Sequence, residues 1–246
     1  MLITSSQNAA LKRLRALYKD KKYRKSEGVF IAEGVNLVKD IPDRFEIDEL
    51  FIKESRKDEL SFIADRFGKE PYVVKDSLFD ATSDTRTPSG VIAVVKRTEE
   101  IKSAEGDIVL LLDGISDSGN LGTIIRTAAA RGIKTVICAS CADAFSPKTV
   151  RAAMSGTFRT EIIETDVGGA LGLLSDYRIV GLDMGGKCIY GYKREGKTAI
   201  AVGSEAHGLG EEVRKAASDT VSIPMENGVE SLNAAVSISI AMYLIQ

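Results

Sequence analysis

The chain has 246 residues, which is enough for two modest domains or one large one. Hydrophobic residues make up 44% and charged residues 28%, as in ordinary globular proteins, and no apolar run is long enough to span a membrane. The formal net charge is −2, and the three cysteines have no framework spacing, so we expect a protein of the reducing cytoplasm.

A basic segment lies near the N-terminus. Between residues 10 and 26, eight basic residues accompany one acid, Asp20, which gives a local charge of +7; they are Lys12, Arg13, Arg15, Lys19, Lys21, Lys22, Arg24 and Lys25. Leu11, Leu14 and Leu17 recur at helical spacing, so we expect one helix that packs on its apolar side. The basic side is either a solvated helix face or a surface for phosphates, and packing of the helix favours a nucleic-acid surface.

The rest of the first 98 residues alternates short apolar runs with helical patterns. Strands are expected at residues 28–33, 49–53, 71–75 and 91–95, and helices at 34–39, 58–67 and 76–81. Residues 99–106 are polar and weakly periodic, so we expect a linker there between a domain of residues 1–98 and one of residues 107–246.

The second domain repeats the alternation, which predicts an α/β fold with a parallel sheet. Strands are expected at residues 107–113, 135–138, 178–182, 198–202 and 220–223. Helices are expected at residues 121–131, 148–154, 168–174, 211–217 and 232–244. Polar residues that follow the apolar runs ending at Gly203 and Ile223 predict a ligand site at the carboxyl ends of the strands.

A phosphate-binding motif also occurs in this domain. The segment from Gly191 to Thr198 matches the P-loop pattern G-x-x-x-x-G-K-[ST], and Asp113 closes an apolar strand. A P-loop needs a helix that starts at the Lys-Thr pair, but Thr198 leads into a strand. This context argues against a nucleotide hydrolase.

Other candidate sites are weak. Cys138 and Cys141 form a lone C-x-x-C without a second ligand pair, so we expect buried or incidental thiols and no metal site. His207, the one histidine, lies in a glycine-rich loop, where a general base is possible but an incidental residue is more common.

The loop after the strand at residues 107–113 is more distinctive. Asn120 suits a helix N-terminus, where its side chain can cap free amides. Arg126 follows inside an otherwise apolar stretch, where an arginine needs an acceptor or an anion. The two interpretations are an internal salt bridge, for example to Glu205, and a contact with phosphate or substrate.

Three segments together resemble the SpoU (TrmH-type) branch of the SPOUT RNA methyltransferases, in that family's order and spacing. They are Asn120–Ala128, Ala201–Leu209 and Ile223–Val236, and residues 146–158 fit the family's middle segment. Ser118 stands where the family usually has proline, and Ser204 where it often has Asn or Ala. The first domain is similar to the family's ribosomal-protein-like substrate-binding domain.

The resemblance implies a parallel-sheet SPOUT domain with a deep C-terminal trefoil knot, behind a small N-terminal α/β RNA-binding domain. It also implies a homodimer with its active site at the subunit interface, and no membrane attachment. The cofactor would be S-adenosylmethionine, held in the knot by residues that include Leu182, Gly203, Ile223, Met225 and Leu232.

The implied reaction is methyl transfer to a ribose 2′-hydroxyl of RNA, most simply of ribosomal RNA. By the resemblance, the catalytic residues are Asn120, Arg126, Glu205, Ser231 and Asn233. Arg126 acts either as a base or, because its pKa exceeds about 12, as a charged group that binds phosphate and stabilises the oxyanion. RNA contacts are expected from Lys12, Arg15, Lys22, Arg24 and Arg151.

Four alternatives remain open from the sequence. They are the same chemistry on transfer RNA, an antibiotic-resistance methyltransferase of the same family, a non-catalytic RNA-binding protein on the same fold, and a P-loop nucleotide hydrolase. The intact set of Asn120, Arg126, Glu205, Ser231 and Asn233 argues against the non-catalytic protein.

Overall fold

The structure, a computed structural model, describes residues 2–98 and 103–246. Its compact units are residues 1–99 with 145–151, and residues 100–144 with 152–246. Part of the expected linker, residues 99–102, lies outside the described residues. No helix in the described parts of the chain is long and apolar enough to cross a membrane.

The first unit is built on a mixed five-stranded sheet in the order β1-β4-β3-β5-β2. Its strands are β1 (Leu2–Ile3), β2 (Val29–Glu33), β3 (Ile47–Lys53), β4 (Tyr72–Val74) and β5 (Val91–Lys96). β5 is antiparallel to both β2 and β3, whereas β4 is parallel to β1 and β3. The first unit therefore has a mixed sheet, because β5 runs antiparallel between β2 and β3.

The helices of the first unit are α1 (Ala9–Lys19), α2 (Lys21–Glu27), α3 (Val35–Lys39), α4 (Ser61–Phe67) and α5 (Asp76–Thr82), with a short 3₁₀ turn, η1 (Glu54–Arg56). Leu11, Leu14 and Leu17 of α1 are buried in the core of the unit, as their spacing predicts. The basic segment is not one helix, however. Asp20 ends α1 and caps α2 by accepting the amides of Lys22 (2.8 Å) and Tyr23 (3.1 Å).

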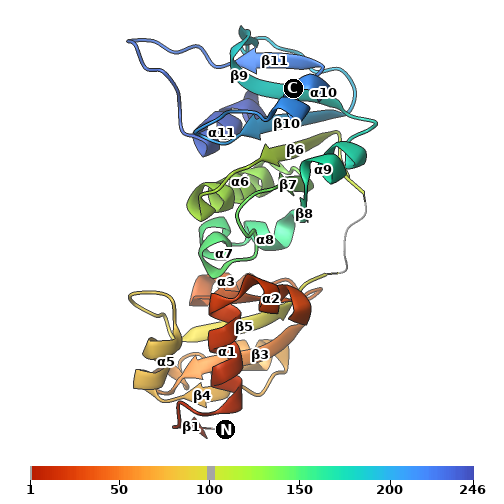
Figure 1. The fold of residues 1–246 in the computed structure, drawn as a ribbon. Helices are drawn as coiled ribbons and strands as arrows, with labels where there is room; N and C mark the ends of the chain where they lie inside the picture. The colour runs from red at the N-terminus through yellow and green to blue at the C-terminus, as the bar shows by residue number, and fades with distance from the viewer. Residues whose placement is uncertain (1, 99–102) are drawn as a thin grey trace. The chain divides into compact units, whose positions relative to one another are not determined.

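The second unit carries six parallel strands in the order β11-β9-β10-β6-β7-β8, which confirms the predicted parallel sheet. The strands are β6 (Ile108–Asp113), β7 (Thr135–Ala139), β8 (Glu161–Thr165), β9 (Arg178–Cys188), β10 (Thr198–Gly203) and β11 (Asp219–Ser222). The helices are α6 (Ser118–Arg131), α7 (Pro147–Ala153), α8 (Gly156–Arg159), α9 (Val167–Leu173), α10 (Glu211–Ala216) and α11 (Ala234–Leu244). Figure 1 shows α6 and α11 together on one face of this sheet, and α9 and α10 on the other.

Two features of this sheet were not predicted from the sequence. The first is the pair of short elements α8 and β8, whose residues have no strong hydrophobic periodicity. The second is the length of β9, which was expected to end at Leu182 but continues to Cys188. Between Thr220 and Val221 the register of β11 against β9 shifts, so residues 182–186 bulge out of the sheet. Gly186 permits this, because a Cβ at that position would lie 2.6 Å from the backbone of Val221.

Candidate active site

A tight turn at the carboxyl end of β10 forms one wall of the site. The amide of Gly208 donates to the carbonyl of Ser204 at 2.9 Å, and the amide of His207 donates to Ser204 Oγ at 3.3 Å. An added Cβ at Gly203 would lie 1.9 Å from the carbonyl group of Gly208. Only glycine therefore fits where β10 meets this turn.

Asp113 fixes the far side of the same turn. It ends β6 and is buried, and its Oδ2 accepts the amide of Gly210 at 2.6 Å. In a P-loop protein, a carboxylate at the end of a strand would bind the metal ion. Here the Asp113 carboxylate instead holds the start of α10 in place.

A cleft of about 520 Å³ lies beside this turn, within the range of about 300–1,000 Å³ usual for small-molecule sites. Its lining includes all five residues expected to bind the cofactor: Leu182, Gly203, Ile223, Met225 and Leu232. Glu205, Ser231 and Asn233, which we expect to be catalytic, also line it. Three separate stretches of chain, at 182–184, 202–208 and 221–237, thus meet around one cavity together with Arg214.

Asn233 connects the cleft to the start of α11. Its Oδ1 caps the helix by accepting the amides of Ala235 (2.9 Å) and Val236 (3.3 Å). Its Nδ2 donates to Oδ1 of Asn120 at 3.1 Å. Because the cap assigns the acceptor end of the Asn233 amide, the donor end must point at α6.

Asn120 does not cap α6, contrary to the prediction from its position. The cap is Asp117, whose Oδ1 accepts the amide of Asn120 at 2.8 Å, so that α6 begins at Ser118. The Asn120 side chain instead donates from Nδ2 to Oε1 of Glu205. An ordered series of hydrogen bonds therefore runs from Asn233 through Asn120 to the Glu205 carboxylate.

Arg126 lies on α6, six residues after Asn120, with an exposed side chain that does not line the cleft. Its guanidinium has no hydrogen bond or ion pair with any residue that the structure describes, so the internal salt bridge to Glu205 is not formed. α8 packs closely behind it, since a Cβ on Gly156 would lie 2.9 Å from the Arg126 Cα. The arginine is thus held by its backbone and keeps its charge available for an anion.

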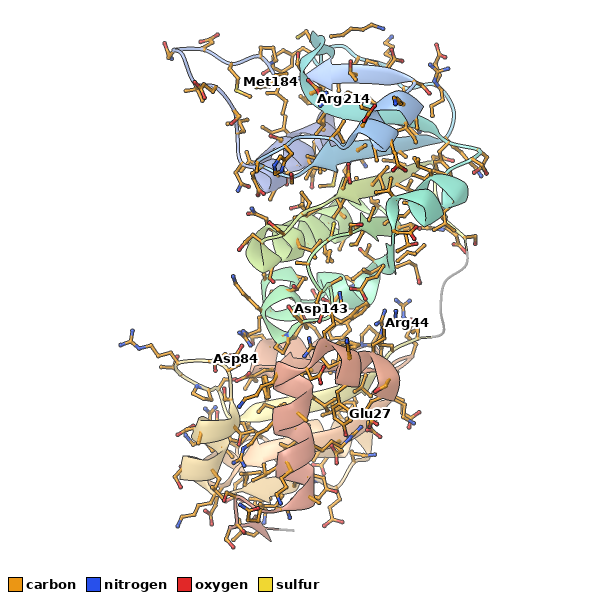
Figure 2. All side chains as sticks on the ribbon, viewed as in Figure 1. Glu27, Arg44, Asp84, Asp143, Met184 and Arg214 are labelled. Atoms are coloured by element: carbon orange, nitrogen blue, oxygen red, sulfur yellow. The ribbon has the colours of Figure 1, made fainter. Side chains whose placement is uncertain are left out.

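Two charged residues of the cleft were missed in the sequence. Arg214 of α10 forms an ion pair with Asp183 of the β9 bulge, at 3.2 Å, and both line the cleft. Met184, next to Asp183, lines the cleft with 74% of its surface exposed. Figure 2 shows Met184 and Arg214 close together in the second unit. The pair Gly185-Gly186 was the one sequence signal that this strand carries a bulge.

The P-loop interpretation is not supported by the structure. The Lys197 ammonium pairs with Asp176 at 2.7 Å, and this contact raises the pKa of Lys197. Thr198 is fully buried at the start of β10, so no helix N-terminus is available to a phosphate.

The cysteines and the histidine lie at different places in the structure, since His207 lines the cleft and none of the cysteines does. In the described residues, no cluster of three or more His, Cys, Asp or Glu side chains could hold a metal ion. Cys138 is buried, and the Cys141 thiol donates to the carbonyl of Leu112 at 3.2 Å. His207 lines the cleft through the turn at 204–208.

The basic residues expected to bind RNA differ in exposure. Lys12 and Lys22 are exposed, without an ion pair inside residues 2–98 and 103–246. Arg15 is half-buried, and its guanidinium donates to the carbonyl of Ser6 at 2.9 Å and to Thr82 Oγ1 at 3.3 Å.

Arg24 and Arg151 lie elsewhere. Arg24 is buried, with Nη1 donating to the carbonyl of Leu17 at 2.5 Å, so it supports the junction of α1 and α2 and does not belong to an exposed surface. Arg151 lies half-buried on α7, in the segment that groups with the first unit.

Comparison with known proteins agrees with this geometry. Residues 107–243 match the SpoU rRNA Methylase family, and residues 8–93 match the MRM3-like substrate binding domain. The chain is 30% identical to the 23S rRNA (guanosine(2553)-2′-O)-methyltransferase RlmP of Bacillus subtilis, over 98% of this chain and 97% of that protein.

Solved structures show the same fold. An AdoMet-bound rRNA methyltransferase from Sinorhizobium meliloti superimposes with a TM-score of 0.86 at 26% identity, covering 99% of this chain and 96% of that one. The SpoU methyltransferase AviRb from Streptomyces viridochromogenes, in complex with AdoMet, superimposes with a TM-score of 0.86 at 26% identity, covering 97% of both chains. The family match spans more than half of the chain and a full-length relative supports it: this chain belongs to the SpoU rRNA methylase family.

Proposed function

We propose that this protein transfers a methyl group from S-adenosylmethionine to a ribose 2′-hydroxyl of ribosomal RNA. The observation that carries the proposal is the junction of Asn120, Glu205 and Asn233 at the cleft, with Arg126 six residues further along α6. The RlmP relative, which acts on 23S rRNA, supports ribosomal RNA as the substrate class.

The cleft fits the cofactor in chemistry as well as in size. Leu182, Ile223 and Leu232 offer apolar surface for an adenine ring, and the turn at 204–208 offers backbone groups. When bound, S-adenosylmethionine supplies a methyl group on a sulfonium, which is an electrophile that needs an aligned nucleophile.

The ribose hydroxyl is a poor nucleophile, and the residues at the rim supply alignment and charge. The guanidinium of an arginine is a permanent cation, so we assign Arg126 to the target phosphate and the developing oxyanion. Glu205, fixed by the Asn120 amide, is the carboxylate placed to accept a hydrogen bond or proton from the substrate. Ser231 and Asn233 border the same space.

The assembly and domain roles are part of the proposal. Residues 1–98 are assigned to RNA binding and residues 107–246 to catalysis.

A homodimer is supported by Val236 and Tyr243 of α11, which are 46% and 51% exposed. A trefoil knot is supported by the likeness to the AdoMet-bound structures, and a cytoplasmic location by the thiol state of all three cysteines. Light scattering tests the dimer.

The decisive experiment is methyl transfer in vitro with isotopically labelled S-adenosylmethionine. Unmodified 23S ribosomal RNA transcript and bulk transfer RNA serve as separate substrates, and nuclease digestion locates the label on the ribose. Label in the 23S transcript supports the proposal. Label only in transfer RNA corrects the substrate, and no transfer to either RNA despite cofactor binding supports the non-catalytic alternative.

A further inference from the structure

A buried carboxylate in the first unit has no role in the methyl transfer described above. Glu33 ends β2 with 6% of its surface exposed. Its Oε2 accepts the Tyr18 phenol at 2.6 Å, and its Oε1 accepts the hydroxyls of Thr85 (2.9 Å) and Ser83. Burial and the neighbouring Glu33 raise the pKa of Tyr18, so the phenol keeps its proton and donates.

These contacts tie down one end of the loop at residues 83–90, which joins α5 to β5 (Figure 1). The other end is fixed as well. Ser89 Oγ accepts the amide of Val35 at 3.1 Å, and the carbonyl of Ser89 accepts Arg56 Nη1 at 3.2 Å. A loop anchored at both ends presents its middle residues in a defined conformation.

Arg86 is in that middle stretch. It is exposed, and its side chain has no partner among the residues described. Its neighbour Thr85 shares the Glu33 carboxylate with Tyr18 of α1. The Glu33 carboxylate therefore holds the loop against α1, next to Arg86 and its unpartnered guanidinium.

The facing side of α1 is basic. Arg15 donates to Thr82 at the end of α5, where the loop begins. Lys12 and Lys19 lie three residues before and four residues after Arg15, so they share its helix face, and both are exposed without an ion pair to a described residue. By contrast Arg13, on another face, is engaged by three carboxylates: Glu27, Asp48 and Glu49.

We propose that Arg86 with Lys12, Arg15 and Lys19, here called the loop–helix surface, binds the phosphate backbone of the RNA substrate, and that Glu33 is the positioning residue of this surface. The inference rests on the proposed function, since it assigns where the first unit contacts the RNA. Asp84, the one acid of residues 83–90, is already paired with Arg151 at 2.9 Å, so its charge does not offset these four cations in a chain whose net charge is −2. A concentrated positive charge on a rigid loop and helix suits the closely spaced charges of a nucleic-acid backbone.

The first test is the salt dependence of RNA binding by Arg86→Ala. The probe is the unmodified 23S ribosomal RNA transcript, titrated at several salt concentrations. A lost phosphate contact weakens binding about three- to tenfold and reduces the slope of log K against log salt by about 0.7 to 0.9. The matched control is Lys75→Ala, an exposed lysine at the opposite end of α5, which should leave both values unchanged.

The second test addresses Glu33 without altering its buried side chain. The double variant Ser83→Ala/Thr85→Ala removes both loop hydroxyls from the carboxylate, whereas Thr87→Ala removes an exposed hydroxyl of the same loop that has no described partner. The double variant should raise the KM for RNA at least threefold, with kcat and the S-adenosylmethionine Kd unchanged. Thr87→Ala should match the wild type, and circular dichroism confirms that both variants fold.

The outcomes separate this inference from the proposed function. Wild-type protein that neither binds nor methylates the 23S transcript would overturn the proposed function. If the wild type methylates it but Arg86→Ala keeps the full salt slope, the loop–helix surface is wrong while the methyltransferase assignment stands. A double variant indistinguishable from Thr87→Ala would remove Glu33 from the positioning role.

Discussion

The side chain of Asn233 donates a hydrogen bond to that of Asn120 at 3.1 Å, across 113 positions of sequence. Both amides are oriented by what lies beyond them, since Asn233 caps α11 and Asn120 donates to Glu205. Helix capping, which is ordinarily a matter of stability, therefore sets the direction of the hydrogen bonds that reach the Glu205 carboxylate.

Asn233→Ala should lose stability and catalysis together. Loss of the cap costs about 1 kcal/mol of unfolding free energy, and loss of the Asn120 contact should lower kcat at least tenfold. The matched control is Asn8→Ala, because Asn8 caps α1 in the same way, accepting the amides of Ala10 (2.9 Å) and Leu11 (3.4 Å). Thermal unfolding and kcat at saturating RNA are the measurements. Equal kcat in the two variants would show that the Asn233–Asn120 bond has no catalytic consequence.

Arg126→Ala should separate catalysis from stability. The exposed, unpartnered guanidinium contributes little to folding, so the unfolding free energy should change by less than about 0.5 kcal/mol. Loss of a charge aimed at the developing oxyanion should lower kcat about 10²- to 10³-fold. S-adenosylmethionine affinity, measured by calorimetry, should not change.

Arg159→Ala provides the control for Arg126, as Arg159 is an exposed arginine of α8 with no described partner. It should retain wild-type kcat and stability. Methyl transfer that persists at the wild-type rate in Arg126→Ala would refute the role assigned to Arg126.

Gly203→Ala should abolish cofactor binding. The new methyl group would lie 1.9 Å from the backbone of Gly208, and backbone cannot move aside as a flexible side chain can. We expect a cost of more than about 3 kcal/mol and no calorimetric signal with S-adenosylmethionine. Gly172→Ala, where nothing lies within 4 Å in α9, should instead be neutral or stabilising by up to about 1 kcal/mol.

Tyr192 should make the stability of the second unit fall at alkaline pH. Burial and a hydrogen bond to Asp219, at 3.1 Å, raise the pKa of Tyr192 to about 12 from an ordinary value of 10.0. The contribution of Tyr192 to the unfolding free energy is thus complete below pH 10 and is lost as the pH rises toward 12. Chemical unfolding at several pH values should show this loss in the wild type and a weaker one in Tyr192→Phe. Parallel pH profiles for the two proteins would contradict it.

Much of the fold follows from local pattern. The fully buried strands β2 and β10 read as apolar runs, and the predicted resemblance to the SpoU family is confirmed by the family match and by full-length relatives. The chain is accordingly a methyltransferase of that family. The expected cofactor residues come together because the bulge of β9 lies beside the carboxyl ends of β10 and β11 in a parallel sheet.

The errors arose where a distant partner overrides a local rule. Asn120 satisfies the sequence preference for a helix cap, but Asp117 takes that position and Glu205, 85 residues away, takes the Asn120 side chain. The charged neighbours of Arg24 in the sequence predict a solvated side chain. Because the helix breaks at Asp20, the Arg24 guanidinium instead donates to the carbonyl of Leu17. Propensity and periodicity contain no information about such contacts.

Lys197→Ala distinguishes the methyltransferase from the nucleotide hydrolase that the P-loop pattern suggests. In a P-loop the lysine holds the nucleotide phosphates, and its loss abolishes binding and turnover. Here Lys197 pairs on the surface with Asp176, at 2.7 Å, and an exposed pair of this kind contributes little to stability. The variant should therefore keep wild-type methyl transfer, and neither protein should bind ATP in calorimetry. Asp176→Ala, which removes the other partner, should behave identically, whereas ATP binding by the wild type that disappears in Lys197→Ala alone would restore the P-loop interpretation.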